Sequence, residues 1–118
     1  MATDGFAKLR ARWQKERTER ERCSAELRRR LIERGGPILG AYGVREAWLF
    51  GSVADGKPRS DSDLDLLVMP IAVEHYWSLR RDLEDAVGRP LDLYTQDDDP
   101  IFVTKVKARG ELIYEVQS

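Results

Sequence analysis

Three aspartates set among leucines are the residues of this chain whose types and spacing best suit chemistry. The segment at 63–66 reads Asp-Leu-Asp-Leu, and Asp92 stands between two leucines in the segment 91–93. Residues two apart in a strand point to the same face, so Asp63 and Asp65 would present paired carboxylates while the leucines point into a core. If the strand that holds Asp92 lies beside theirs, its carboxylate joins the pair.

Three carboxylates about 5 Å apart would repel one another by roughly 3 kcal/mol per pair at an effective dielectric constant near 20. No basic residue stands among them to offset this repulsion. Mg²⁺ would offset it, because this hard cation is commonly held by a few carboxylates, water and substrate phosphates together. Asp63, Asp65 and Asp92 are therefore candidate metal ligands and catalytic residues of a site with two such ions, which orient an attacking hydroxyl and bind a leaving pyrophosphate.

A Gly-Ser pair precedes the first aspartate by ten intervening positions and follows an apolar run. Gly51 would let the chain approach a triphosphate closely. The Ser52 hydroxyl and nearby backbone N–H groups would hold phosphate oxygens. Together with the acids, this pair indicates a site of nucleotidyl transfer.

An aspartate-rich run also raises two other interpretations, a calcium loop and a solvated loop. Asp61, Asp63 and Asp65 match the first three ligand positions of an EF-hand, but Leu66 stands where that loop needs Gly and Ala72 where it needs Glu. The calcium loop is excluded on this pattern, and the solvated loop stays as the alternative to a metal–nucleotide site.

The elements that must position these residues follow from periodicity and turn signals. Strands are predicted at 44–50, 63–68, 91–94 and 111–115, and helices at 73–87 and 100–108. The alternation of strands and helices predicts an α/β domain with a small mixed sheet and flanking helices.

The first third of the chain is different in character. Residues 6–34 contain neither Pro nor Gly and are rich in Arg, Glu, Ala and Leu, which predicts a long charged helix. Gly35, Gly36 and Pro37 should end this helix, and a short helical stretch should follow at 37–42. We therefore divide one compact chain into a charged helical segment at 1–36 and a catalytic domain at 37–118.

Such a helix would be about 45 Å long, whereas the remainder of the chain should be about 30 Å across if globular. Phe6, Leu9 and Trp13 lie at helical spacing and need burial that a small sheet does not supply. A partner subunit, a second copy of the chain, a kink in the helix or plain exposure would each account for the excess length. We favour partner binding, and homo-oligomerisation through this helix is an open alternative.

Composition bounds the partners and the compartment. The 118 residues carry a formal net charge of −1, with eleven basic and six acidic residues in 1–34, so a uniformly basic nucleic-acid coat is disfavoured. The single Cys23 excludes an internal disulfide and a Cys-rich zinc site and fits a reducing compartment. No window approaches the roughly 18 apolar residues of a membrane span, and no signal-peptide core is visible. We expect a cytoplasmic protein that does not contact a membrane.

The motifs Phe50-Gly51-Ser52, Ser60 to Val68 and Leu91-Asp92-Leu93 resemble those of the DNA polymerase β-like nucleotidyltransferase superfamily. They look most like its short minimal nucleotidyltransferase (MNT) branch, over about residues 38 to 115. The resemblance implies the MNT fold, two Mg²⁺ ions and ATP as substrate. It also implies that Asp63 and Asp65 hold both ions, and that Asp92 completes the catalytic metal site and helps to deprotonate the acceptor.

Members of this branch often pair with a HEPN ribonuclease as toxin and antitoxin. The resemblance therefore implies an antitoxin of a type VII-like module, which transfers AMP from ATP to a tyrosine of its HEPN partner. Two alternatives stay open: an antitoxin that neutralises its partner by binding alone, and nucleotidyl transfer to RNA or a small molecule. The chain has little room for the extra domain that usually holds the last kind of acceptor.

One departure from the family pattern concerns the phosphates. Many relatives follow Gly-Ser with a basic residue and then Ala-Arg-Gly, whereas this chain has Asp55 at the position of the Arg. A carboxylate does not bind phosphate as a guanidinium does. Lys57 and Arg59 of the same loop are the candidate replacements, and we assign Arg59 to the phosphates together with Gly51 and Ser52.

Overall fold

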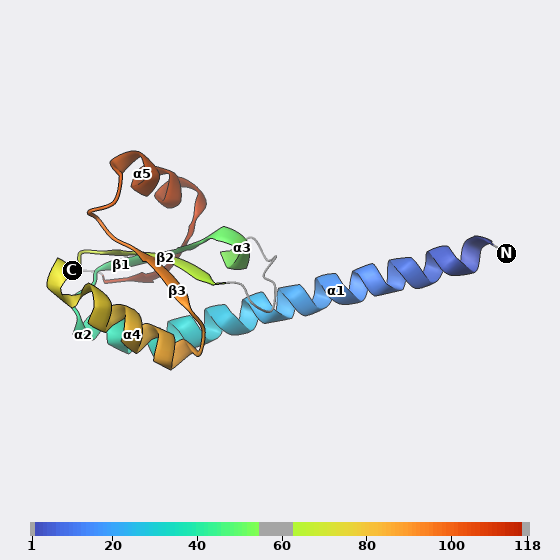
Figure 1. Ribbon diagram of the computed structural model, residues 1–118, viewed down its shortest axis with the longest axis horizontal. Helices are drawn as coiled ribbons and strands as arrows, with labels where there is room; N and C mark the ends of the chain where they lie inside the picture. The colour runs from blue at the N-terminus through green and yellow to red at the C-terminus, as the bar shows by residue number, and fades with distance from the viewer. Residues whose placement is uncertain (1, 55–62, 117–118) are drawn as a thin grey trace.

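Four strands form one mixed sheet in the computed structural model (Figure 1). The structure describes residues 2–54 and 63–116, and for residues 2–6, 52 and 53 it describes the backbone alone. The strands are β1 (Glu46–Phe50), β2 (Leu64–Met69), β3 (Leu91–Tyr94) and β4 (Glu111–Glu115), in the order β3-β2-β1-β4. β2 and β3 are parallel, and β1 is antiparallel to β2 and to β4. The predicted α/β class with a small mixed sheet is confirmed.

The crossover between the two parallel strands is helical, as predicted. A 3₁₀ turn, η2 (Val73–His75), leads into α4 (Tyr76–Val87). The helix ends at Gly88, whose φ of 77° is the left-handed conformation common after helix ends. Its three buried residues are spaced four apart and face the sheet: Leu79, Leu83 and Val87.

The N-terminal helix continues past the point where the sequence predicts its end. α1 (Ala2–Arg30) passes through a π-helical turn, η1 (Leu31–Gly35), directly into α2 (Gly36–Ala41). The predicted termination at Gly35, Gly36 and Pro37 is therefore wrong. Pro37 lies in the first turn of α2, directly after the π-helical turn, where its missing N–H costs little.

The core lies between the sheet and the layer formed by α1, α2 and α4 (Figure 1). Alternate residues of each strand point into it, because side chains of a strand alternate between faces. Each fully buried leucine contributes roughly 1.5–3 kcal/mol relative to exposure. The fully buried leucines of this cluster come from the helices and three strands: Leu31, Leu39, Leu49, Leu64, Leu66, Leu79, Leu83 and Leu91.

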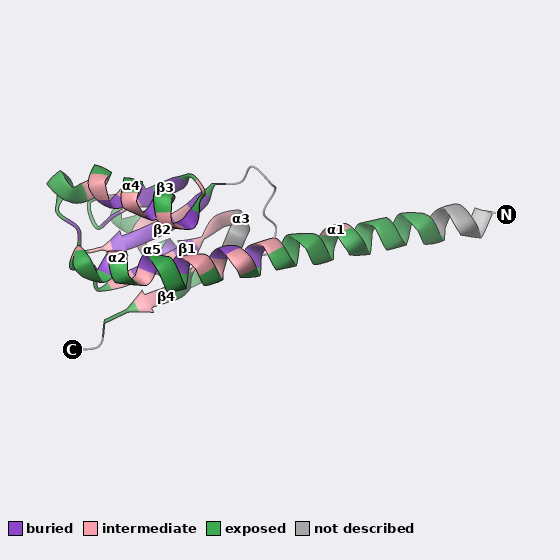
Figure 2. Ribbon diagram, turned by 90° about the horizontal axis from the view of Figure 1, so that it is seen from below, coloured by how far each residue is buried: buried purple, intermediate pink, exposed green. Residues whose placement is uncertain are grey.

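Only the C-terminal part of α1 contributes to this core. Leu27 is buried, as is Leu31 at the start of η1, whereas α1 is exposed along most of residues 7–22 and projects away from the sheet (Figure 2). The chain consequently measures 63 Å along its longest axis and 29 and 25 Å along the others. Leu9 and Trp13 are 40% and 56% exposed, so the expected lack of burial within the chain is confirmed for them. The side chain of Phe6 lies outside the described residues.

The opposite face of the sheet is covered in part by α5 (Pro100–Arg109) (Figure 1). The Asp99 side chain caps this helix by accepting a hydrogen bond of 2.8 Å from the Ile101 N–H. Val106 is the residue of α5 that is buried against the sheet. None of the described helices combines the length and the apolar character that a bilayer crossing requires.

Candidate active site

Two of the three candidate carboxylates stand side by side on neighbouring strands. Asp65 of β2 and Asp92 of β3 are paired in the parallel register, so their side chains leave the same face of the sheet. That face is the one opposite the helical core, because the residues on either side of each aspartate are buried leucines. Asp92 is exposed and Asp65 is half-buried. The structure therefore brings these two acids together at the solvent-facing side.

Asp63 lies at the edge of this pair, one residue before β2 begins, and is exposed. It is close enough to act electrostatically on its neighbour. Burial raises the pKa of Asp65 above its ordinary value, and the negative charges of Asp92 and Asp63 raise it further. The negative charges of Asp92 and Asp63 thus act on Asp65, and a shared metal site of the three acids stays a prediction.

Gly51 brings the backbone into direct contact with this acidic group. It follows β1 as the first residue of α3 (Gly51–Ala54) and has a φ of +78°. A Cβ atom placed on Gly51 would overlap the Asp65 carboxylate. Any other residue here would therefore have to displace Asp65 and adopt a left-handed conformation.

The other predicted phosphate ligands are described only in part. Ser52 lies in α3, immediately after Gly51, and its side chain is outside the described residues, as are Asp55, Lys57 and Arg59 altogether. The end of α3 is held by α1, because the Arg28 guanidinium donates a hydrogen bond of 2.9 Å to the Ala54 carbonyl oxygen. The turn after β1 is thus fastened to the N-terminal helix.

The donor set fits a hard divalent cation that is held in part by substrate. Asp63, Asp65 and Asp92 form no ion pair with any residue that the structure describes, and the pKa of Asp65 is raised first by burial and then by the charges of Asp92 and Asp63. Across 2–54 and 63–116, however, no group of three or more His, Cys, Asp or Glu side chains lies so that it could hold a metal ion by itself. Carboxylates on an open face with incomplete protein coordination are typical of Mg²⁺ sites completed by water and phosphate oxygens.

An aromatic cluster borders the acids on the same face. Phe50 is the antiparallel register partner of Asp65, and its ring centroid lies 5.4 Å from that of Tyr94 and 5.6 Å from that of Phe102. Burial raises the pKa of Tyr94, and the charges of Asp92 and Asp65 raise it further. The rings therefore form an apolar cluster next to Asp65 on this face of the sheet.

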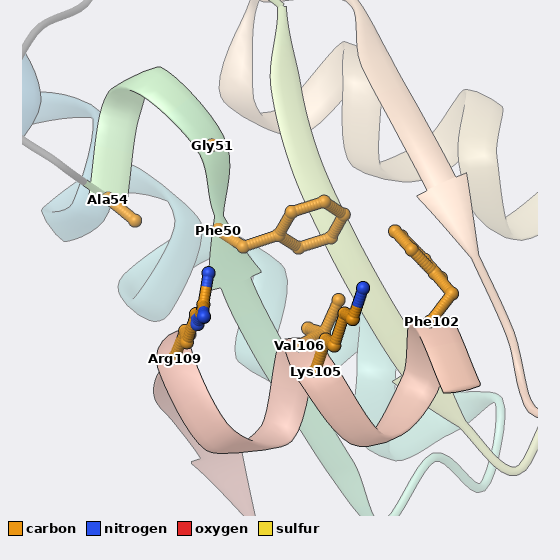
Figure 3. Close-up of a pocket in the computed structure, with 8 residues that line it drawn as sticks. Phe50, Gly51, Ala54, Phe102, Lys105, Val106 and Arg109 are labelled. Carbon is orange, nitrogen blue, oxygen red and sulfur yellow. The ribbon is translucent and has the colours of Figure 1, made fainter. Parts of the chain in front are cut away.

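A cavity of about 300 Å³ opens beside this cluster and was missed by the reasoning from sequence (Figure 3). It lies between the end of β1, α3 and one side of α5. The helix contributes Phe102, Lys105, Val106 and Arg109, a set spaced at i, i+3, i+4 and i+7. That spacing places them on one helix face and is the signal that could have identified them. Gly51 lines the same cavity and so connects it to Asp65.

Comparison with known proteins relates this arrangement to one family. Residues 37–118 match the family model described as polymerase beta, nucleotidyltransferase. A protein of Methanocaldococcus jannaschii, to which protein adenylyltransferase activity is attributed, is 33% identical over 73 residues, which span 59% of this chain and 74% of that protein.

Two solved structures share the fold. A chain in the crystal structure of a toxin–antitoxin with AMP-PNP superposes with a TM-score of 0.64 at 21% identity, over 73% of this chain and 74% of that chain. A structure assigned as a minimal nucleotidyltransferase superposes with a TM-score of 0.56 at 29% identity, over 64% of this chain and 81% of that chain.

Proposed function

The chain belongs to the polymerase beta nucleotidyltransferase family and is a nucleotidyltransferase. From this premise we propose that it transfers AMP from ATP to a tyrosine hydroxyl of a HEPN ribonuclease toxin in the cytoplasm. In this role it is the antitoxin of its pair. The observation that carries the proposal is the pairing of Asp65 with Asp92 on one open face, with Gly51 in contact with the Asp65 carboxylate.

Each part of the site has a role in this reaction. Asp63 and Asp65 would hold two Mg²⁺ ions, and Asp92 would complete the site of the catalytic ion. When bound, such ions act as Lewis acids that stabilise negative charge on the transferring phosphate. The missing side chain of Gly51 lets the Asp65 carboxylate approach the start of α3, where the Ser52 hydroxyl and backbone N–H groups would bind the triphosphate oxygens.

The bond changes balance without any further reactant. The acceptor oxygen forms a bond to the α-phosphorus of ATP, and the bond from that phosphorus to the bridging oxygen of the β-phosphate breaks. Pyrophosphate leaves. The exposed Asp92 carboxylate accepts the proton that the acceptor hydroxyl loses.

A protein acceptor is supported by two findings. The Methanocaldococcus jannaschii relative is attributed protein adenylyltransferase activity, and the fold is shared with a chain of a toxin–antitoxin complex. The projecting part of α1, with the exposed Leu9 and Trp13, supplies a surface on which such a partner can dock (Figure 2).

The test is transfer of label from α-labelled ATP to the purified toxin in the presence of Mg²⁺. We expect labelled toxin with the wild-type chain and none with the double variant Asp63→Asn, Asp65→Asn. Asp97→Asn is the matched control, because Asp97 is exposed in the loop after β3. This substitution removes the same charge at a position away from the three candidate acids. Absence of label with the wild-type chain, or equal label with the double variant, contradicts the proposal.

A second candidate function is neutralisation of the toxin by binding alone. The observation in its favour is the long exposed part of α1, which is available for contact whether or not the site is active. A variant that lacks all three acids distinguishes the two functions. Full neutralisation by that variant supports binding alone, and loss of neutralisation supports catalysis.

A further inference from the structure

The cavity beside Gly51 has an apolar interior and two cations at its opening. Phe50, Phe102 and Val106 line its interior, and Lys105 and Arg109 rise from the same side of α5 toward Phe50 and α3 (Figure 3). A cavity of about 300 Å³ with this lining can accept a chemical group that has an apolar part and a negative charge at one end.

The two cations have no counter-charge among the described residues. Neither Lys105 nor Arg109 takes part in an ion pair or hydrogen bond there, and both are exposed. Lys107 of the same helix, by contrast, pairs with Glu46 at 2.8 Å. Like charges four residues apart on a helix disfavour each other by about 0.2–0.5 kcal/mol, so an anion between them would be favoured.

The position of the cavity relates it to the candidate acids. Gly51 lines the cavity and lies against the Asp65 carboxylate, so a nucleotide bound at the acids reaches the cavity directly. α3 itself carries no cation, since its residues are Gly, Ser, Val and Ala. The negative tail of a nucleoside triphosphate therefore needs positive charge from outside α3, and besides Lys57 and Arg59 of the following loop, α5 presents it.

We propose that Lys105 and Arg109 bind the β- and γ-phosphates of ATP at the opening of this cavity. The inference rests on the proposed function, since it concerns the substrate of the same site. It makes α5 part of the phosphate site and explains how the turn after β1 can bind a triphosphate although α3 has no basic residue. Bidentate contact by a guanidinium is well suited to phosphate oxygens, and a lysine adds a point charge.

The test measures binding without any toxin present. Isothermal titration calorimetry in Mg²⁺ buffer with ATP, tripolyphosphate and AMP is applied to the wild-type chain and to Lys105→Gln, Arg109→Gln and the double variant. We expect each single variant to bind ATP and tripolyphosphate about tenfold more weakly, the scale of one charge-assisted hydrogen bond, and the double variant about 100-fold. Affinity for AMP, which has no β- or γ-phosphate, should stay within about twofold.

Two further variants make the test specific. Lys107→Gln removes the same charge from the same helix outside the cavity and should bind ATP like the wild type. Arg59→Gln examines the loop residue assigned from sequence. The proposal is overturned if Lys107→Gln is as damaging as Lys105→Gln, if AMP affinity falls in step with ATP affinity, or if Arg59→Gln alone removes binding while the α5 variants bind normally.

The outcomes also separate this inference from the proposed function. A wild-type chain that binds ATP through α5 but labels no toxin contradicts the proposed function and leaves the phosphate assignment standing. A chain that labels toxin while its α5 variants bind ATP normally contradicts the phosphate assignment alone. A wild-type chain that binds neither ATP nor tripolyphosphate contradicts both.

Discussion

The contact between Gly51 and Asp65 allows the geometry of the site to be perturbed separately from its charges. In Gly51→Ala the charges are unchanged, but the new methyl group occupies the position of the Asp65 carboxylate. The left-handed backbone, with φ of +78°, costs about 1–2 kcal/mol for a non-glycine residue. Reduced freedom of the unfolded chain returns about 0.4–1 kcal/mol, so the net loss of unfolding free energy is about 1 kcal/mol.

The chain provides matched controls for this substitution. Gly43 and Gly88 have the same φ of 77°, and a Cβ atom on either meets nothing within 4 Å. Gly43→Ala and Gly88→Ala should therefore lose the same ~1 kcal/mol, or about 4 °C in melting temperature. Only Gly51→Ala should, in addition, displace a candidate metal ligand.

Thermal unfolding with and without Mg²⁺–ATP separates the two effects. A ligand at one hundred times its dissociation constant stabilises the folded state by about 2.7 kcal/mol, so the wild type and both control variants should gain several degrees. Gly51→Ala should lose most of this gain, because each tenfold loss of affinity removes about 1.4 kcal/mol. Equal ATP-dependent gains in all four proteins would refute the reasoning that Gly51 is required by its contact with Asp65.

Three further predictions follow from the acids and from α1. Because the pKa of Asp65 is raised in the folded state, its ionisation opposes folding as the pH rises through the folded pKa. Asp65→Asn should therefore have a higher melting temperature than the wild type at pH 7 without metal. In a pH series, the two melting temperatures should converge below the unfolded pKa of about 4. Addition of Mg²⁺ with ATP should reverse this order, because only the wild type is stabilised, and a retained gain in the variant would count against metal binding. Trp13→Ala should leave the melting temperature nearly unchanged but weaken toxin binding in a calorimetric titration, because Trp13 is exposed. Leu27→Ala, at a buried position, should cost about 2–5 kcal/mol of unfolding free energy. Toxin affinity unaffected by Trp13→Ala would exclude the exposed part of α1 as the docking surface.

Local patterns were sufficient to predict the elements that hold the candidate acids. Strict alternation around Asp65 and Asp92 identified two strands with a leucine face and an acidic face, and that is how they lie. The predicted strands at 91–94 and 111–115 agree with the observed residues. The adjacency of the two acids was conditional on strand order, which arises from packing of the whole sheet and is not a local property.

Two features were not predictable from local signals. Gly35 to Pro37 is a strong helix-ending pattern, but tertiary packing of Leu31 and Leu39 on either side and a π turn carry the helix through it. The cavity formed by α5 depends on which face of that helix meets β1 and α3, and Lys105 and Arg109 acquire their meaning only from that contact. Hydrophobic periodicity predicted the helix at 100–108, but it did not predict which elements each face of that helix packs against.

The claim on which this account depends is that Asp63, Asp65 and Asp92 bind divalent metal together with the triphosphate. Electron paramagnetic resonance of Mn²⁺, used in place of Mg²⁺ and titrated with a non-hydrolysable ATP analogue present, measures this directly. The account predicts two bound Mn²⁺ ions per wild-type chain and in the Asp97→Asn control, and loss of bound metal in Asp65→Asn and in Asp92→Asn. Equal Mn²⁺ binding by all four proteins would contradict it.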